Sequence, residues 1–201
     1  MELPVYELKI STDINDNEEV NFVALVDKPA IERNFLAFKD EFIDPSKEIA
    51  FSIQSEDQHI ISGPLMIPNK LMYRNNKKFG EHYVTFSKET VKEIAIKYAK
   101  KGYQSNVNLM HNDNSIVPGI ILFESFITDK ERGIAPIKGF EDCEDGTWFG
   151  SFYVENKSVW QDVKDGKYKG FSVEGLFDYE PTEDKVTQLL RELSETLNVP
   201  I

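Results

Sequence analysis

The stretch Tyr168-Lys169-Gly170-Phe171-Ser172-Val173-Glu174-Gly175-Leu176-Phe177 predicts one β-strand that carries a serine. Side chains alternate between the two faces of a strand, so Ser172 and Glu174 share one face while Phe171 and Val173 oppose it. Glycines lie on both sides of the serine, and glycine within a strand often marks a bulge or a close approach of another backbone. A serine with such room around it is a candidate nucleophile, although serines in strands more often only hydrogen-bond locally.

The composition narrows the class of protein. The chain has 201 residues, 40% of them hydrophobic, and a formal net charge of −12, which suits one sizeable acidic domain. Such acidity argues against a nucleic-acid-binding surface, which needs clustered Lys and Arg. The single cysteine, Cys143, lies in an acidic run, so we expect no internal disulfide and no cysteine nucleophile. With one cysteine and three histidines, we predict no metal and no other cofactor.

No apolar stretch reaches the roughly 20 residues of a membrane span, and the N-terminus lacks a secretory signal pattern. We therefore expect a cytosolic protein that does not associate with membranes.

The hydrophobic pattern predicts many short strands and few helices. The clearest helix follows Ser87, with apolar residues at helical spacing up to Tyr98 and a stop at Gly102. A second, short helix is predicted over Ser158 to Lys164. Residues 1–179 are thus expected to form a β-rich α+β domain, a partly closed β-barrel with flanking helices.

Residues 180–201 form a separate predicted element. After Pro181, Thr182 is a suitable cap for an amphipathic helix with a leucine-rich stripe. The strongly polar opposite face suggests a scaffold or self-association segment, and ordinary packing on the domain is an equal alternative.

A serine nucleophile requires a base, and three histidines are available. His59 lies in a polar stretch that predicts a solvated turn, and His82 begins a strand at the surface or the edge of the core. His111 ends the apolar stretch Val107 to Met110, so it is the best candidate for a half-buried base. The alternative for His111 is a strand-end residue that hydrogen-bonds to its neighbours. Gly150-Ser151 is a weaker nucleophile candidate because it lies among aromatic residues.

Several blocks of the sequence together resemble a known family. They are Ala24-Leu25-Val26-Asp27-Lys28-Pro29-Ala30-Ile31, Gly63-Pro64-Leu65-Met66-Ile67-Pro68-Asn69-Lys70, Asn108-Leu109-Met110-His111, Gly146-Thr147-Trp148-Phe149-Gly150-Ser151-Phe152 and Gly170-Phe171-Ser172-Val173-Glu174-Gly175. In this order and spacing the chain resembles the prohead, or capsid maturation, serine proteases of tailed phages, over roughly residues 20–178. It is most similar to the subgroup found in defective-prophage-like gene clusters.

The resemblance implies a fold like that of the herpesvirus assemblins, with Ser172 as the nucleophile and His111 as the general base. Assemblins use a second histidine after the serine, and none follows Ser172 here. Phage members use a carboxylate, for which Glu124 is our candidate because it is a lone acid in an apolar run. An exposed charge at the barrel rim is the alternative for Glu124. Asp113 and Glu174 are less favoured because each lies close in sequence to its partner.

The function implied is a serine endopeptidase that cleaves scaffold and major capsid proteins, and itself, during procapsid maturation. The resemblance also implies a homo-oligomer inside the assembling procapsid, in the bacterial host cytoplasm. One alternative is a protease-fold assembly protein without activity. Another is a peptide- or glycan-binding β-domain with an exposed aromatic face of Trp148, Tyr153 and Trp160.

Overall fold

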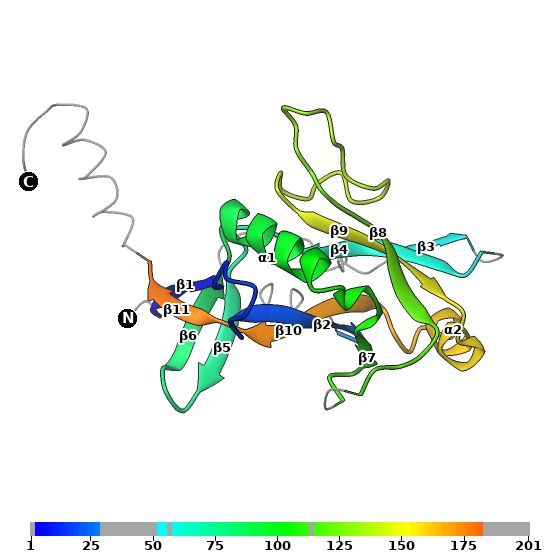
Figure 1. The fold of residues 1–201 in the computed structure, drawn as a ribbon, viewed down its shortest axis with the longest axis horizontal. Helices are drawn as coiled ribbons and strands as arrows, with labels where there is room; N and C mark the ends of the chain where they lie inside the picture. Colours follow the sequence, from blue (N-terminus) through cyan, green and yellow to red (C-terminus); the bar gives the residue numbers. More distant parts are fainter. Residues whose placement is uncertain (1–2, 29–51, 56–57, 113–114, 183–201) are drawn as a thin grey trace, which may run out of the picture.

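The described part of the chain folds into many short strands and two α-helices (Figure 1). The computed structural model describes residues 3–28, 52–55, 58–112 and 115–182. In chain order the elements are β1 (Val5–Lys9), β2 (Glu19–Val26), β3 (Ser52–Ser55), β4 (Ile60–Met66), β5 (Met72–Asn76), β6 (Gly80–Thr85), α1 (Lys88–Lys100), the 3-10 turn η2 (Tyr103–Ser105), β7 (Val107–Leu109), β8 (Ile120–Ile127), β9 (Trp148–Val154), α2 (Lys157–Lys164), β10 (Gly170–Leu176) and β11 (Asp178–Pro181).

The strands form three sheets, which confirms the prediction of a β-rich fold. Their orders are β11-β1-β6-β5, β10-β2-β7 and β3-β4-β9-β8. Within the described residues none of these sheets closes on itself, so the expected partly closed barrel is not formed. The reason is that the hydrogen-bonded ladder is interrupted: β10 packs against β4 but pairs only with β2, and the sheets meet through side chains.

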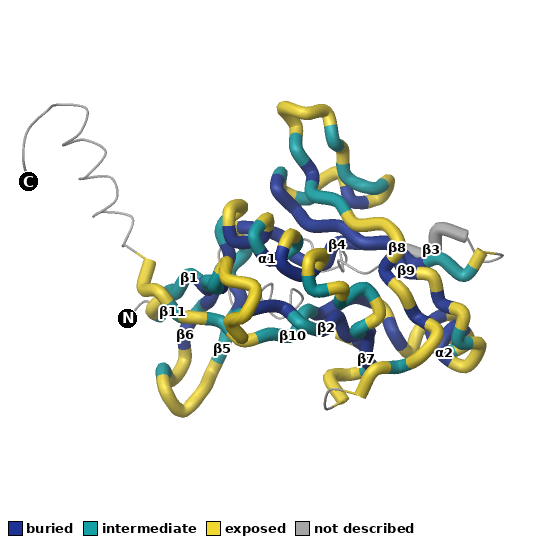
Figure 2. The backbone as a smooth tube through the Cα atoms, viewed as in Figure 1, coloured by how far each residue is buried: buried dark blue, intermediate teal, exposed yellow. Residues whose placement is uncertain are grey.

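The core lies where the three sheets and α1 meet, and the buried segments of β2, β4 and β9 converge there (Figure 2). Its largest fully buried side chains include Trp148, Tyr98 and Phe152. One face of the β10-β2-β7 sheet faces this core. The opposite face of that sheet carries Ala24, Asn108 and Ser172, which are also buried.

The predicted helices are present with nearly the expected bounds. Ser87 caps α1 by accepting a hydrogen bond from the backbone of Thr90, as the sequence predicts. Helix α2 begins at Lys157, where Asn156 is the cap. No helix among the described ranges is long and apolar enough to cross a membrane. The helix predicted over 180–201 lies outside the described residues from 183 onward, and β11 occupies Asp178–Pro181.

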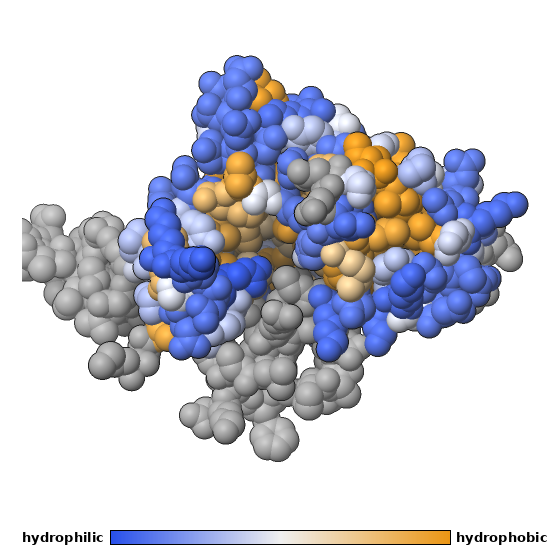
Figure 3. Space-filling model, turned by 90° about the horizontal axis from the view of Figure 1, so that it is seen from below, coloured by the Kyte–Doolittle hydropathy of each residue, from blue (hydrophilic) through white to orange (hydrophobic). Residues whose placement is uncertain are grey.

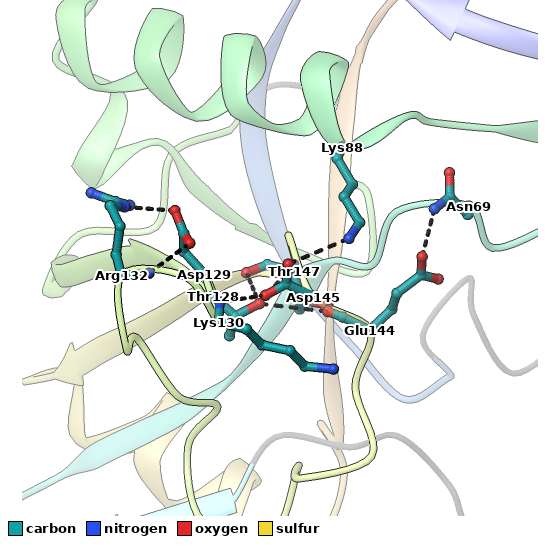
Figure 4. Close-up of polar contacts among 9 residues, drawn as sticks. All are labelled: Asn69, Lys88, Thr128, Asp129, Lys130, Arg132, Glu144, Asp145 and Thr147. Atoms are coloured by element: carbon teal, nitrogen blue, oxygen red, sulfur yellow. Dashed lines mark hydrogen bonds and ion pairs between the residues drawn. The ribbon is translucent and has the colours of Figure 1, made fainter.

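The long connection between β8 and β9 is tied back to the domain by polar contacts (Figure 4). Asn69 donates a 2.6 Å hydrogen bond to Glu144, and Lys88 at the start of α1 lies 3.4 Å from Asp145. Exposed pairs of this kind each contribute little. Together they fix the loop beside the segment that joins β4 to β5, which lines the candidate site.

Candidate active site

The β10-β2-β7 sheet brings distant parts of the chain into register. Ser172 on β10 lies opposite Ala24 on β2, which lies opposite Asn108 on β7. Paired residues on neighbouring strands point to the same face, and Glu174 shares that face because it is two residues beyond Ser172. The alternate residue Phe171 belongs to the hydrophobic core. The predicted alternation of this strand is therefore observed.

A bulge follows the serine on β10. The register with β2 shifts between Glu174 and Gly175, and a Cβ on Gly175 would lie 2.1 Å from the carbonyl oxygen of Glu19. Only glycine fits against a backbone at that distance. Bulges bend a strand and re-aim side chains, and this one lies directly beside the Glu174 carboxylate.

A tight turn positions the histidine at the end of β7. Met110 and His111 both have left-handed backbone angles, with φ of 54° and 58°. The Met110 amide still donates to Leu25 on β2, while the Asn112 amide donates back to the Leu109 carbonyl. Two successive left-handed residues are the geometry of a type I′ turn, which reverses the chain sharply. The turn places the His111 ring at the edge of the serine-bearing face.

His111 contacts a carboxylate from β10. Its Nδ1 lies 2.9 Å from Oε1 of Glu174, and the same oxygen accepts a 2.7 Å hydrogen bond from Nδ2 of Asn108. When Nδ1 donates to Glu174, the lone pair of the neutral ring is on Nε2, as a general base requires. Ala24 lies between these strands in register, and its methyl group leaves space for Glu174 to cross.

Ser172 lies at the wall of a cavity. It is 6% exposed and lines a cavity of about 240 Å³ between β10, β4 and β5. Its hydroxyl makes no hydrogen bond within the described part of the chain, including to His111, which leaves it available for a bound molecule. Among the described strands β10 pairs with β2 alone, so its other edge faces the cavity rather than another described strand.

The structure separates Glu124 from this cluster. Glu124 is an exposed residue of β8 in a different sheet, opposite Ser151 of β9. The carboxylate that reaches His111 is instead Glu174. The strand alternation already placed Glu174 on the face of Ser172, and this was the signal that could have identified it. Asp113 lies outside the described residues.

The other two histidines, His59 and His82, pack against aromatic rings. His82 is fully buried, which corrects its predicted position at the surface or core edge, and its ring packs edge-on against Tyr6. His59 stacks on Trp160 at 4.7 Å, and one ring nitrogen lies 3.1 Å from the carbonyl oxygen of Val154. Neither contacts a carboxylate in the described residues.

Other candidate features are buried. Trp148 and Trp160 lie in the core and only Tyr153 of the three is exposed, so the expected aromatic binding face is not formed.

Burial, together with the neighbouring Asp142 carboxylate, raises the pKa of the Cys143 thiol to about 11, which disfavours a thiolate. Among the described residues no group of three or more His, Cys, Asp or Glu side chains could hold a metal ion.

Comparison with known proteins gives one match. No curated protein and no solved structure matches the chain. One family model matches residues 47–180, about two thirds of the chain, and so includes His111, Ser172 and Glu174 but not the Ala24–Ile31 block. The chain belongs to the family described as "Putative phage serine protease XkdF".

Proposed function

We propose that the protein is a serine endopeptidase in which Ser172, His111 and Glu174 form the catalytic group. The observation that carries this proposal is the 2.9 Å contact between His111 Nδ1 and Glu174, on the same sheet face as Ser172. A serine, a histidine and a carboxylate that orients the histidine are the parts that acyl transfer needs. Membership of a family of phage serine proteases supports the same chemistry.

The reaction follows from these positions. As a peptide enters the cavity, the Ser172 Oγ attacks the scissile carbonyl carbon while Nε2 of His111 takes the hydroxyl proton. Glu174 accepts the Nδ1–H hydrogen bond and stabilises the imidazolium that forms. His111 then gives the proton to the leaving amine, and water hydrolyses the acyl-enzyme. Catalytic hydrogen bonds commonly tighten only when substrate binds. We propose that the hydrogen bond between Ser172 and His111 forms at that step.

The edge of β10 away from β2 could bind the substrate backbone, since no other described strand pairs with it. An extended peptide that lies along this edge would pair with β10 as an additional strand. A backbone N–H near Ser172 would then stabilise the oxyanion, and losing one such donor typically costs about 10²–10³ in rate. No side chain is required for that task.

We also propose the biological role that the phage family suggests. The substrates would be the scaffold and major capsid proteins, and the enzyme itself, within an assembling procapsid in the host cytoplasm. The protease would act there as a homo-oligomer. A distant relation to the herpesvirus assemblins is part of this proposal and rests on the order of the histidine and serine blocks.

The decisive experiment uses a fluorophosphonate probe and co-expression with the phage capsid and scaffold proteins. Ser172 should be labelled, and Ser172→Ala should abolish both labelling and trimming of the capsid and scaffold proteins. A wild-type rate of trimming in the Ser172→Ala variant would refute the nucleophile assignment.

A second candidate is an inactive assembly protein that retains the protease fold. It is favoured by one observation, the lack of a hydrogen bond between Ser172 and His111 in the described structure. It predicts no probe labelling of the wild-type protein and no effect of His111→Ala on processing. The two candidates are therefore separated by the same pair of measurements.

A further inference from the structure

Lys97 on α1 is a buried cation, with only 3% of its surface exposed. Its Nζ donates hydrogen bonds to the backbone carbonyls of Ser11, Asp16 and Glu18, at 2.8, 3.1 and 3.2 Å. A lysine ammonium group has three N–H donors, so these carbonyls occupy all of them. A buried charge is costly unless it is paired or hydrogen-bonded in this way. The proposed reaction does not use this ammonium group, so its role lies in what it holds in place.

The segment that Lys97 holds is the beginning of β2. The three carbonyls belong to the connection between β1 and β2, and α1 packs against β2. Glu19, the first residue of β2, is attached to the same end of the helix. Its carboxylate forms an ion pair with Lys101, accepts a 2.8 Å hydrogen bond from Tyr103 and lies 3.9 Å from the Nζ of Lys97. The start of β2 is thus fixed to α1 through both main chain and side chain.

The start of β2 is also the partner of the bulge in β10. Glu18 forms an isolated bridge with Leu176. Glu19 pairs with Leu176, and Val20 pairs with Gly175. No side chain would fit between Gly175 and the carbonyl oxygen of Glu19, so the two backbones are in close contact. A shift of this end of β2 would therefore be transmitted to the bulge.

The bulge in turn lies beside the candidate catalytic carboxylate. The register shifts between Glu174 and Gly175, so the bulge sets the direction in which the Glu174 side chain leaves the strand. Seen from below, hydrophobic side chains line a hollow beside the β5–β6 hairpin (Figure 3). Lys97 is not among the described residues that line the cavity beside Ser172. An effect of Lys97 on the site would therefore pass through the main chain rather than through contact with substrate.

We propose that Lys97, supported by Lys101, is a positioning residue for the Glu174 carboxylate. The contacts run from the Lys97 ammonium group to the start of β2, then to the bulge at Gly175 and then to Glu174. This inference rests on the proposed function, in which Glu174 orients His111. It adds a residue on a helix outside the catalytic sheet that keeps the carboxylate in place.

The first test is Lys97→Met, which keeps the length of the side chain and removes the ammonium group. The kcat for a fluorogenic peptide should fall by about 10–100-fold, the scale of a small misplacement of a catalytic group, while KM changes by less than about twofold. The rate of fluorophosphonate labelling of Ser172 should fall by the same factor as kcat. A wild-type kcat and labelling rate in the folded variant would overturn the proposal.

A double-mutant cycle tests whether Lys97 acts through Glu174. Labelling rates are compared for the wild type, Lys97→Met, Glu174→Gln and the double variant. Residues that act on one interaction have non-additive effects, so Lys97→Met should slow labelling by less than about twofold in the Glu174→Gln background. Equal fold losses in the two backgrounds would show that Lys97 acts by another route and would refute the proposal.

Val91→Ala is the matched control for a general loss of stability. Val91 is a fully buried core residue of the same helix, and its apolar side chain cannot hydrogen-bond to the β1–β2 connection. Both variants should lower the Tm, but only Lys97→Met should lower kcat when activity is assayed well below both Tm values. A comparable loss of kcat in Val91→Ala would assign the effect to helix stability and refute a positioning role.

Lys101→Met is a milder second variant that decides the question if Lys97→Met does not fold. It removes the ion pair with Glu19 and keeps the three hydrogen bonds of Lys97. Since the start of β2 loses one attachment to α1, kcat should fall by about two- to fivefold, the scale of an ion pair of this kind, with KM unchanged. A wild-type kcat in Lys101→Met would then overturn the proposal.

The outcomes separate this inference from the proposed function. Labelling of wild-type Ser172 that is equally fast in Lys97→Met would refute the positioning role and keep the protease. Absence of labelling and cleavage in the wild-type chain would refute the protease, and the positioning role with it.

Discussion

Two serines on strands, Ser172 and Ser151, have similar local sequences and different surroundings. Both are almost fully buried, both lie close to a glycine, and each has a glutamate nearby on its sheet. Ser151 is on β9, which is paired on both sides, and its hydroxyl accepts a 2.8 Å hydrogen bond from Ser62. Ser172 is on β10, which pairs with one neighbour among the described strands and lines a cavity.

The comparison shows that neighbours, rather than the serine motif, decide what each residue can do. A serine in the middle of a sheet has its hydroxyl satisfied and its backbone unavailable to a substrate. A serine at the edge of the described sheet, on the same face as a His111–Glu174 pair, has a candidate base on its own sheet and a strand edge that could bind a peptide. The following experiments test this contrast.

The largest expected difference is between the two serines themselves. Ser172→Ala should lower peptide cleavage by about 10⁶-fold, the size of loss when a serine nucleophile is removed. Ser151→Ala should leave cleavage within a few-fold of wild type, because that hydroxyl only bonds to Ser62. Turnover of a fluorogenic peptide measures both. A comparable loss in the two variants would mean that the contrast between edge and central strand is not the deciding factor.

The two glutamates form the next pair. Glu174→Gln keeps the shape but removes the carboxylate that orients His111, so kcat should fall by on the order of 10⁴. Glu124→Gln changes an exposed residue of another sheet and should have no measurable effect. Kinetics of both purified variants, with circular dichroism to check folding, decide between the carboxylates. Loss of activity in Glu124→Gln alone would restore Glu124 as the third member.

Asn108 acts as a positioning residue for the same carboxylate. Asn108→Ala removes the 2.7 Å hydrogen bond to Glu174, so the carboxylate is less well placed to orient His111. The value of kcat/KM should fall by about tenfold, with the loss in kcat rather than in KM. Asn106→Ala is the control, since Asn106 donates to the backbone of Asn21 instead. A wild-type kcat in Asn108→Ala would show that this hydrogen bond does not position the carboxylate.

The smallest effect concerns stability at the central strand. Ser62→Ala leaves the buried hydroxyl of Ser151 without its partner, so the free energy of unfolding should fall by about 1–2 kcal/mol. Thermal denaturation should show a decrease of a few degrees in Tm. Probe labelling of Ser172 should be unchanged. Reduced labelling would show that the two sheets are coupled.

Local patterns in the sequence predicted much of this structure. The alternation of β10, the bulge at Gly175 and the Ser87 cap of α1 all depend on residues close in sequence. Such features follow from backbone chemistry and from the spacing of apolar side chains, so they do not require knowledge of the tertiary fold.

Contacts between distant segments could not be predicted in the same way. Glu174 on β10 reaches His111 across β2, which has the small Ala24 opposite Asn108, and this arrangement depends on strand order and register. The buried environment of His82 likewise comes from elements distant in sequence, including Tyr6. The expected barrel, which the described strands do not form, was wrong for the same reason. Closure of a barrel depends on pairing between strands that are distant in sequence.

The place of β10 at the edge of its described sheet has a consequence for what the proposed protease could attack. A segment that lies flat along this strand must first be released from its own fold, so compact proteins in the host would resist cutting. Susceptible bonds would be confined to tails and linkers. The conformation of a substrate protein would then decide whether it can bind, before its side chains contribute to specificity.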